Sequence, residues 1–422
     1  MNRKKQNRAC WIWAFLLAPA LAASGGADPS VRFFRVGSGS NTEAMALSAS
    51  GVLVWSNPEA SGRFQIEWSD DVAGGTWRSY LSGPATGRTQ QVKLFDLRPA
   101  PGMAYIPAGD FVAGDAWGAD HTAMPVHTAW VSAFHVDRAP VSKARWDEVR
   151  AWGLTRGYTD LAEGAGGGKR VADIVTNEGV ATTNWLAIEA GPEHPVVLIN
   201  WYDIAKWCNA RSEKEGLTPA YYLDAGWTVV YRTGQVDLAN SQVDWGCTGY
   251  RLPTETEWEK AARGGLVQQH YAWPSMGLYL GDVIDGTMAN YWGSGDAFDQ
   301  GTTPSGYYDG GQVVTNAQGA VLPVQDMGNA YGVHDVVGNV WEFCWDVFSS
   351  TSYAWRVASG DLTDPHGPTY VDLPLRRADR GGSWRSSSLM DLRVPGRWWV
   401  FPGEAATGLN RGFRTVRRAE EP

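Results

Sequence analysis

The sequence predicts an α+β fold in which irregular coil is the largest class, preceded by a small all-β module. The 422 residues include 50 glycines and 23 tryptophans but only 19% charged residues, which is typical of loop-rich chains and not of long charged helices. Hydrophobic residues make up 44% of the chain, enough to build a packed core and to argue against disorder. Helical periodicity is confined to short segments, whereas residues 31–98 have the period of strands.

The first 22 residues have the pattern of a secretory signal peptide. The basic stretch MNRKKQNR precedes the apolar run ACWIWAFLLAPALA, which is too short to span a bilayer and ends in a small-x-small site. We expect cleavage after Ala22 and export to the periplasm or the extracellular space; an uncleaved anchor is the alternative. Cleavage removes four basic residues and takes the formal net charge from −9 to −13. An acidic chain without a basic block or a second long apolar run is not expected to bind nucleic acid or to span a membrane.

Residues 31–98 are predicted to form a β-sandwich-like module. Phe64, Ile66 and Trp68 occupy alternate positions of GRFQIEWSDD, the period of a half-buried strand. GVLVWSN and QVKLFDL are two further short apolar runs, and RPAPG at 98–102 is a linker.

Residues 101–418 form the larger predicted domain. GMAYIPAGDFVAGD predicts two strands around a Pro-Ala-Gly turn. Three segments predict helices: SKARWDEVRAW, NWYDIAKWCNARSEKEG and RLPTETEWEKAARGG. In the third, Thr254 and Glu257 form a capping box, and Gly264 ends the helix. Beyond it we predict loops and short strands without a further helix.

Three cysteines remain after cleavage: Cys208, Cys247 and Cys344. Their spacing fits no zinc motif, and an odd number leaves at least one thiol unpaired. The sequence leaves open whether two of them form a disulfide. Cys208 lies on the apolar face of its predicted helix, which favours a buried thiol over a reactive one.

Two loops combine oxygen-bearing side chains with tryptophans. In DVVGNVWEFCWD, Asp335 and Glu342 flank a Gly-Asn turn that can direct both carboxylates and nearby backbone carbonyls toward one point. In ANYWGSGDAFD, Asn290, Asp296 and Asp299 are close together. Calcium takes six to eight oxygen ligands of this mixed kind, and the tryptophans would anchor the loops in the core. Asx-turns without an ion are the alternative at each loop.

Four segments resemble the formylglycine-generating enzyme family, also called sulfatase-modifying factors. They are GYRLPTETEWEKAARGG, NAYGVHDVVGNVWEFCWD, RGGSW and the closing GFR. The resemblance covers about residues 101–418, in the family's order, and leaves the N-terminal module outside. It implies one compact fold, related to C-type lectins, poor in regular structure and stabilised by calcium.

The resemblance assigns two calcium sites. One carries over onto Asp335, the carbonyls of Gly338 and Val340, and Glu342. The other carries over onto Asn290, the carbonyl of Tyr291, Asp296 and the carbonyl of Phe298. The loop between Tyr291 and Asp296 is shorter than the family pattern.

The same resemblance argues against the family's chemistry. Its authentic enzymes oxidise a sulfatase cysteine to formylglycine with a copper ion held by two cysteines, just downstream of the RGGS motif. Here these places are Ser386 and Asp391, and no cysteine follows Cys344. Neither side chain suits Cu(I), a soft ion that prefers thiolates. Copper is therefore not expected, and calcium is the expected structural cofactor.

Two functions of different classes remain. One is a non-catalytic binding module for an unidentified polar ligand or exported protein; the alternative is a family oxidoreductase that modifies an exported protein or small molecule by divergent chemistry. The missing cysteines favour the first. Because the RGGS segment lines the family's substrate groove, we place a pocket there. Its predicted residues are Ser383, Arg385, Ser386 and Asp391, with Arg393 and Trp398 on the rim. Otherwise Arg393 pairs with Asp391, and Trp398 belongs to the core.

Overall fold

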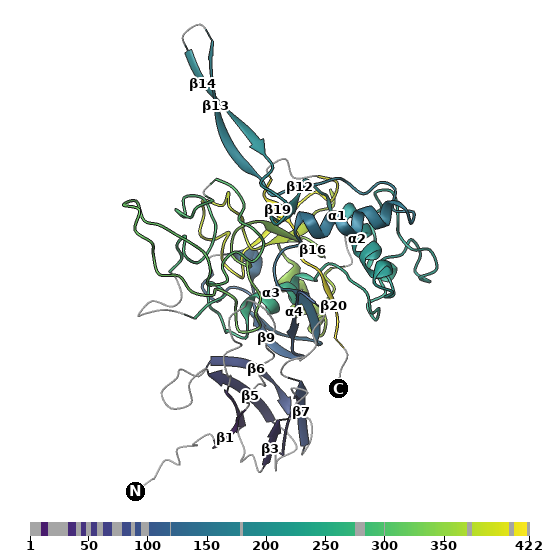
Figure 1. Ribbon diagram of the computed structural model, residues 1–422. Helices are drawn as coiled ribbons and strands as arrows, with labels where there is room; N and C mark the ends of the chain where they lie inside the picture. Colours follow the sequence, from purple (N-terminus) through teal and green to yellow (C-terminus); the bar gives the residue numbers. More distant parts are fainter. Residues whose placement is uncertain are drawn as a thin grey trace.

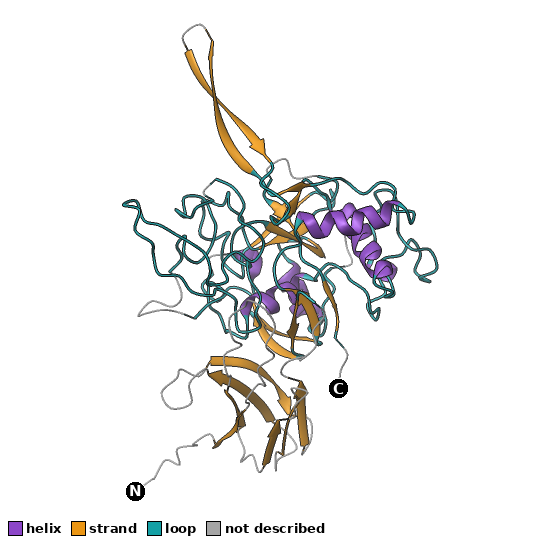
Figure 2. Cartoon of the chain, viewed as in Figure 1, coloured by secondary structure: helices purple, strands orange, loops and turns teal. Residues whose placement is uncertain are grey.

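The computed structural model describes residues 10–15, 33–38, 44–47, 52–56, 62–69, 78–85, 89–93, 101–118, 120–177, 180–274, 283–298, 300–368, 374–404 and 409–419. The described chain mixes helices and sheets, and long stretches of coil connect them (Figures 1 and 2). This arrangement agrees with the predicted α+β class. The relation to C-type lectins stays a prediction.

The N-terminal strands form two sheets. The larger sheet contains β1 (Cys10–Phe15), β2 (Phe33–Ser38), β5 (Gly62–Ser69), β6 (Arg78–Ala85), β9 (Gly109–Ala113) and β10 (His127–Val131), in that spatial order. The smaller sheet has the order β3 (Ala44–Leu47), β4 (Val52–Ser56) and β7 (Thr89–Lys93). Phe64 and Ile66 are buried and Gln65 is exposed, as the alternation on β5 predicts.

Contacts among the described residues connect this part to the larger domain. β6 pairs with β9 at Ser82 and Asp110, so one sheet continues across the predicted linker. The Tyr331 hydroxyl donates to the Tyr80 carbonyl at 2.8 Å. β1 lies within the predicted signal peptide and pairs with β2 at one edge of the sheet, so its removal would leave the rest of the sheet intact.

Two further sheets hold the ends of the larger domain together. β11 (Phe134–Asp137) lies between β8 (Met103–Ile106) and β20 (Val416–Arg418), which brings the start and the end of this domain side by side. The other sheet has the order β18 (Arg397–Val400), β17 (Arg377–Arg380), β16 (Trp341–Val347) and β19 (Arg411–Gly412). β16 is the strand that follows the Gly-Asn turn, and its first six residues are buried.

The three predicted helices are present as α1 (Lys143–Leu154), α2 (Trp201–Lys214) and α3 (Glu255–Arg263). Thr254 caps α3 and forms the predicted capping box with Glu257, a contribution of about 1 kcal/mol. Gly264 ends the helix in the left-handed conformation, at φ 56°.

A fourth helix, α4 (Ser352–Ser359), corrects the prediction that no helix follows α3. Its segment begins in a run of serines and threonines, which resembles a loop locally. The helix depends on long-range contacts instead: Tyr353 is buried, and its hydroxyl donates to Glu259 on α3 at 2.5 Å. The 3₁₀ helices are η1 (His121–Ala123) and η2 (Asn240–Gln242).

Two short sheets complete the described elements. β12 (Ala165–Gly166) pairs with β15 (Val196–Val197). β13 (Lys169–Asn177) and β14 (Val180–Ile188) form a long antiparallel hairpin that projects from the body of the protein (Figure 1). The sequence analysis did not identify this hairpin.

Tryptophans of the acidic segment anchor it in the core, as predicted. The ring of Trp345, on β16, lies 5.3 Å from Trp201, 5.4 Å from Tyr221 and 5.6 Å from Trp245, centroid to centroid. Such aromatic pairs contribute about 0.5–1.5 kcal/mol each beyond the area that they bury. The acidic strand is therefore held by rings from three distant segments of the chain.

The three cysteines expected in the mature chain are buried free thiols. Burial raises the pKa of each thiol, which keeps it protonated and unreactive. Within the described residues, no helix combines the length and apolar character needed to cross a membrane.

Candidate functional site

The RGGSW segment connects both predicted calcium loops. Gly338 donates its N–H to the Gly381 carbonyl at 2.8 Å, and Trp384 donates to the Asn339 carbonyl at 2.9 Å. On the other side, Trp292 donates to the Ser386 carbonyl at 3.2 Å. The structure thus brings together three segments that the sequence analysis treated as separate motifs.

The two calcium loops also contact each other directly. Asn290 and Gly338 form a parallel β-bridge, and the Asn339 N–H donates to the Asn290 carbonyl at 2.8 Å. Asp335, Gly338 and Asn339 all have positive φ, at 55°, 81° and 61°. Aspartate, glycine and asparagine are the residues that adopt this left-handed conformation at lowest cost. The sequence of the turn therefore suits its strained backbone.

The set around Asn290 fits a cation. The Asn290 side chain is buried, and its Oδ1 has no hydrogen-bond partner in the described structure, although an orphaned buried acceptor costs about 1–3 kcal/mol. Asp296 is buried nearby in sequence, and Ser294 donates to its Oδ2 at 2.7 Å. An oxygen-binding cation would supply the missing partner for Asn290 Oδ1.

The set around Asp335 fits a metal cation less well, because Glu342 already pairs with a positively charged side chain of the protein. Arg414 Nε lies 2.6 Å from Glu342 Oε2, and Arg414 Nη2 lies 2.6 Å from Oε1. Trp258 Nε1 also donates to Oε2, at 2.8 Å. This bidentate pair is fully buried and neutralises the Glu342 carboxylate with the chain's own charge.

Asp335 is the carboxylate of this set without such a pair. Burial raises the pKa of the Asp335 carboxyl; the Gly306 N–H, at 2.6 Å, and the charges of His334 and Arg414 lower it, and Glu342 raises it again. The net result is a raised pKa of the Asp335 carboxyl. Asp335 therefore suits a calcium ion, whereas calcium would have to compete with Arg414 for Glu342.

The predicted binding pocket lies beside β18. A pocket of about 530 Å³ is lined by residues around Asp120 at η1, Phe348 after β16, Arg376 before β17, Asp391, and the β18 segment from Gly396 to Trp399. Of the predicted residues, Asp391 and Trp398 line it; Trp398 is 49% exposed and does not belong to the core.

The other predicted residues lie outside the lining. Ser383 and Ser386 are buried, and Arg385 is exposed elsewhere on the surface. Arg393 is partly buried and does not form an ion pair with Asp391. Residues 120–122 and 348–350 also line the pocket, and the sequence did not predict them there. Nothing in the local sequence of those segments indicates a pocket, because they reach it only through the tertiary fold.

Ser386 and Asp391 contact each other at the edge of the pocket. Burial raises the pKa of the Asp391 carboxyl; a hydrogen bond from the Ser386 side chain lowers it, and the charge of Asp120 raises it further. The Ser386 hydroxyl also accepts from the Ser383 N–H at 3.1 Å. At the two places that the resemblance assigns to copper-binding cysteines, the chain thus has a hydroxyl and a carboxylate hydrogen-bonded together.

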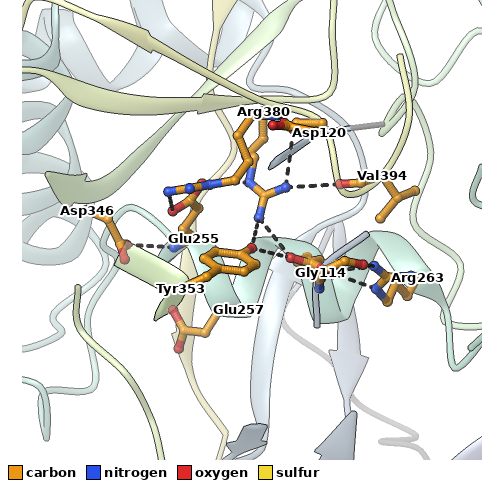
Figure 3. Close-up of polar contacts among 12 residues, drawn as sticks. Gly114, Asp120, Glu255, Glu257, Arg263, Asp346, Tyr353, Arg380 and Val394 are labelled. Carbon is orange, nitrogen blue, oxygen red and sulfur yellow. Dashed lines mark hydrogen bonds and ion pairs between the residues drawn. The ribbon is translucent and has the colours of Figure 1, made fainter. Parts of the chain in front are cut away.

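A buried network of charged side chains adjoins the pocket through Arg397, which lines it; Figure 3 shows contacts of Arg380 and Glu255 within this network. Arg397, on β18, forms a bidentate pair with Glu255 of α3 at 2.6 and 2.8 Å. Its neighbour across the sheet, Arg380, lies 3.0 Å from Glu255 and 2.9 Å from Glu259. Burial alone would raise the pKa of Glu255, but Arg397 and Arg380 outweigh it and the pKa is lowered. The guanidinium of Arg397, a pocket-lining residue, therefore already has a carboxylate partner in Glu255.

Asp346 lies beside this network. It accepts from the Glu255 N–H at 2.6 Å, and Arg356 lies 3.9 Å away. Burial, and then the charge of Glu255, raise the pKa of Asp346 to about 7, although Arg356 opposes them. Charged side chains from α3, α4, β16, β17 and β18 thus meet in one buried network next to the pocket.

Comparison with known proteins agrees with this architecture. Residues 89–419 match the family described as "Sulfatase-modifying factor enzyme 1-like domain". The chain belongs to this family.

Three relatives show its range. The chain is similar to the formylglycine-generating enzyme of Thermomonospora curvata, with 31% identity over 75% of this chain and 93% of the relative. It is similar to the "Chaperone protein LppX" of Paenibacillus barcinonensis, with 30% identity over 54% of this chain and 71% of the relative. It is also similar to the "Inactive C-alpha-formylglycine-generating enzyme 2" of Bos taurus, with 28% identity over 76% and 89%. The names of these relatives describe an enzyme, a chaperone and an inactive protein.

Proposed function

We propose that this chain is a non-catalytic binding protein of the sulfatase-modifying factor family, with its ligand in the pocket beside β18. The observation that carries the proposal is the hydrogen-bonded pair of Ser386 and Asp391 at the edge of that pocket. Two hard oxygen groups do not replace two soft thiolates as Cu(I) ligands. Relatives named as a chaperone and as inactive support a role without oxidation.

Formylglycine-generating activity is expected to be absent. A CxPxR sulfatase peptide incubated with the protein, copper and oxygen should keep its cysteine, because no described thiol lies at the pocket. Mass spectrometry of the peptide measures the conversion, with the same mixture lacking protein as control. Conversion above this control, or stoichiometric copper or iron in the purified protein, would favour the alternative of a divergent oxidoreductase.

We further propose a structural calcium ion at the set of Asn290, Tyr291, Asp296 and Phe298. The orphaned Asn290 Oδ1 supports this set above the set at Asp335, where Arg414 already neutralises Glu342. A calcium ion here would hold two loops against the RGGSW segment and take no part in chemistry.

Removal of calcium is expected to lower the melting temperature by about 5 °C, the effect of losing a ligand present at about one hundred times its Kd. Thermal unfolding is measured with a chelator, and then with excess calcium or magnesium; calcium alone should restore the original curve. The variant Asp296→Asn should lose most of the response. A melting curve that the chelator leaves unchanged would count against the ion.

Export is also part of the proposal. The basic, apolar and small-x-small regions of residues 1–22 support it. When the full chain is expressed in a secreting host, the protein outside the cytoplasm is expected to begin at Ala23. Intact-mass measurement and N-terminal sequencing check this, and retention of Met1 on the exported protein would indicate an anchor instead.

A further inference from the structure

We propose that the pocket beside β18 binds a zwitterion of about dipeptide size, with its cationic end at Asp120 and Asp391 and its anionic end at Arg376. This inference rests on the proposed binding function and specifies its ligand class. It derives from the distribution of unpaired charge around a pocket of about 530 Å³, a size typical of small-molecule sites.

One wall of the pocket carries two carboxylates that lack a cationic partner. Asp120 Oδ1 accepts from the Thr122 N–H and hydroxyl at 2.8 and 2.7 Å, and Oδ2 accepts from the Arg397 N–H at 3.2 Å. Asp391 accepts from the Ser386 hydroxyl. All these donors are neutral, and none of the ion pairs among the described residues involves Asp120 or Asp391.

The two carboxylates are also close enough to repel each other. The charge of Asp120 adds to burial in raising the pKa of Asp391. A positively charged group between them would relieve this repulsion and would find two acceptors at once. The Arg397 guanidinium already has other partners: it pairs with Glu255 and donates to the Ser352 hydroxyl at 2.8 Å.

The other wall carries a cation without an ion-pair partner among the described residues. The Arg376 guanidinium carbon lies 3.8 Å from the centroid of the Trp399 ring, so stacking holds it in place. Its buried Nε has no hydrogen-bond acceptor in the described structure. A planar guanidinium fixed in this way suits a carboxylate, which it can bind through two parallel hydrogen bonds.

The strand β18 sets the distance between the two walls. Asp120 contacts the backbone of Arg397, whereas Arg376 contacts Trp399, two residues further along the strand. At the usual rise per residue, these two positions on the strand are about 7 Å apart, so the charges lie at different points along β18. A ligand that reaches both must be an extended molecule with its charged ends several ångströms apart, as in a dipeptide. Trp398, half exposed beside Trp399, offers an aromatic surface to a side chain between the two ends.

A matched set of three probes tests the two charges separately. The probes are the dipeptide alanyl-phenylalanine, its N-acetyl form, which lacks the cation, and its C-terminal amide, which lacks the anion. Binding to the full protein is measured by calorimetry and by quenching of tryptophan fluorescence. The free dipeptide is expected to bind, and each capped form is expected to bind about tenfold more weakly, the usual loss for a hydrogen bond to a charged group.

Two pocket variants assign each charge to its wall. In Asp391→Asn, the difference between the free and the N-acetyl dipeptide should shrink, while the effect of the amide persists. In Arg376→Gln, the reverse is expected. Arg385→Gln is the matched control, because Arg385 is an exposed arginine outside the pocket lining, and all three affinities should stay unchanged.

The outcomes separate the ligand class from the proposed function. Equal binding of all three probes, or the same losses on capping in both variants, overturns the inference. If no probe binds but uncharged or singly charged fragments bind and Trp398→Ala weakens them, the zwitterion is wrong and the binding function stands. If nothing binds at this pocket and the protein oxidises the sulfatase peptide, both proposals fail.

Discussion

Replacing Arg414 with methionine is expected to lower the free energy of unfolding by about 3–5 kcal/mol, the usual cost of leaving one buried charge without its partner. Arg414 and Glu342 are both fully buried and pair through two contacts of 2.6 Å. Arg414 also donates to the carbonyls of His334 and Asp137, at 2.9 and 3.1 Å. Its loss therefore removes the side-chain link between the closing GFR segment and β16, and leaves the backbone pairing of Gly412 with Glu342.

Denaturant unfolding in the absence of calcium measures this effect. The double variant Glu342→Gln, Arg414→Met is the control: it removes both charges and keeps an acceptor for Trp258 Nε1, so it should recover more than half of the loss. If the double variant is as unstable as Arg414→Met, the cost lies in packing or in the lost carbonyl contacts and not in the stranded charge.

The buried pair of Glu342 and Arg414 also limits which variants can test calcium binding. A variant that removes Glu342 strands the buried Arg414, so it loses stability with or without an ion. Chelation and Asp296→Asn avoid this difficulty, because Arg414 keeps its partner in both. The comparison of wild-type and Arg414→Met protein with added calcium is informative in turn, since only the variant leaves Glu342 free for an ion.

Replacing Gly338 with alanine is expected to lower the free energy of unfolding by several kcal/mol. At the upper end of this range the variant would not fold stably. Gly338 has φ 81°, and a Cβ built on it would lie 2.2 Å from the Asn290 carbonyl oxygen. A left-handed alanine alone costs about 1–2 kcal/mol. The additional clash involves backbone that is itself hydrogen-bonded to Asn339, so it cannot be relieved by a side-chain rotation.

Gly360→Ala is the matched control for this prediction. Gly360 ends α4 with a similar φ of 74°, but an added Cβ would meet no atom within 4 Å. Its cost should be about 1–2 kcal/mol, the backbone term alone. Thermal and denaturant unfolding of the two variants separate the clash from the conformational cost. Equal destabilisation would mean that the Asn290 loop yields to the new methyl group.

Local sequence patterns predicted the elements that depend on local interactions. The helix α3 begins at its capping box and ends at its glycine because hydrogen bonds between neighbours three or four residues apart decide both ends. The alternation on β5 placed Phe64 and Ile66 inside for the same reason, since strand geometry directs alternate side chains to one face. The helix α4 escaped prediction because its stability comes from Tyr353 and Glu259, which are 94 residues apart.

The features of the candidate site divide in the same way, into those that the local sequence decides and those that long-range contacts decide. The sequence by itself determined the family, the turn residues of the acidic loop, and the lack of any cysteine after Cys344, because residue identity alone decides which soft ligands are present. Only the tertiary structure decided that Arg414 neutralises Glu342, and that Asp120 and Arg376 line the same pocket as Asp391. These charges acquire their partners, or lack them, through contacts between segments far apart in the chain, and a buried charge is stabilised only by whatever the fold places within a few ångströms of it.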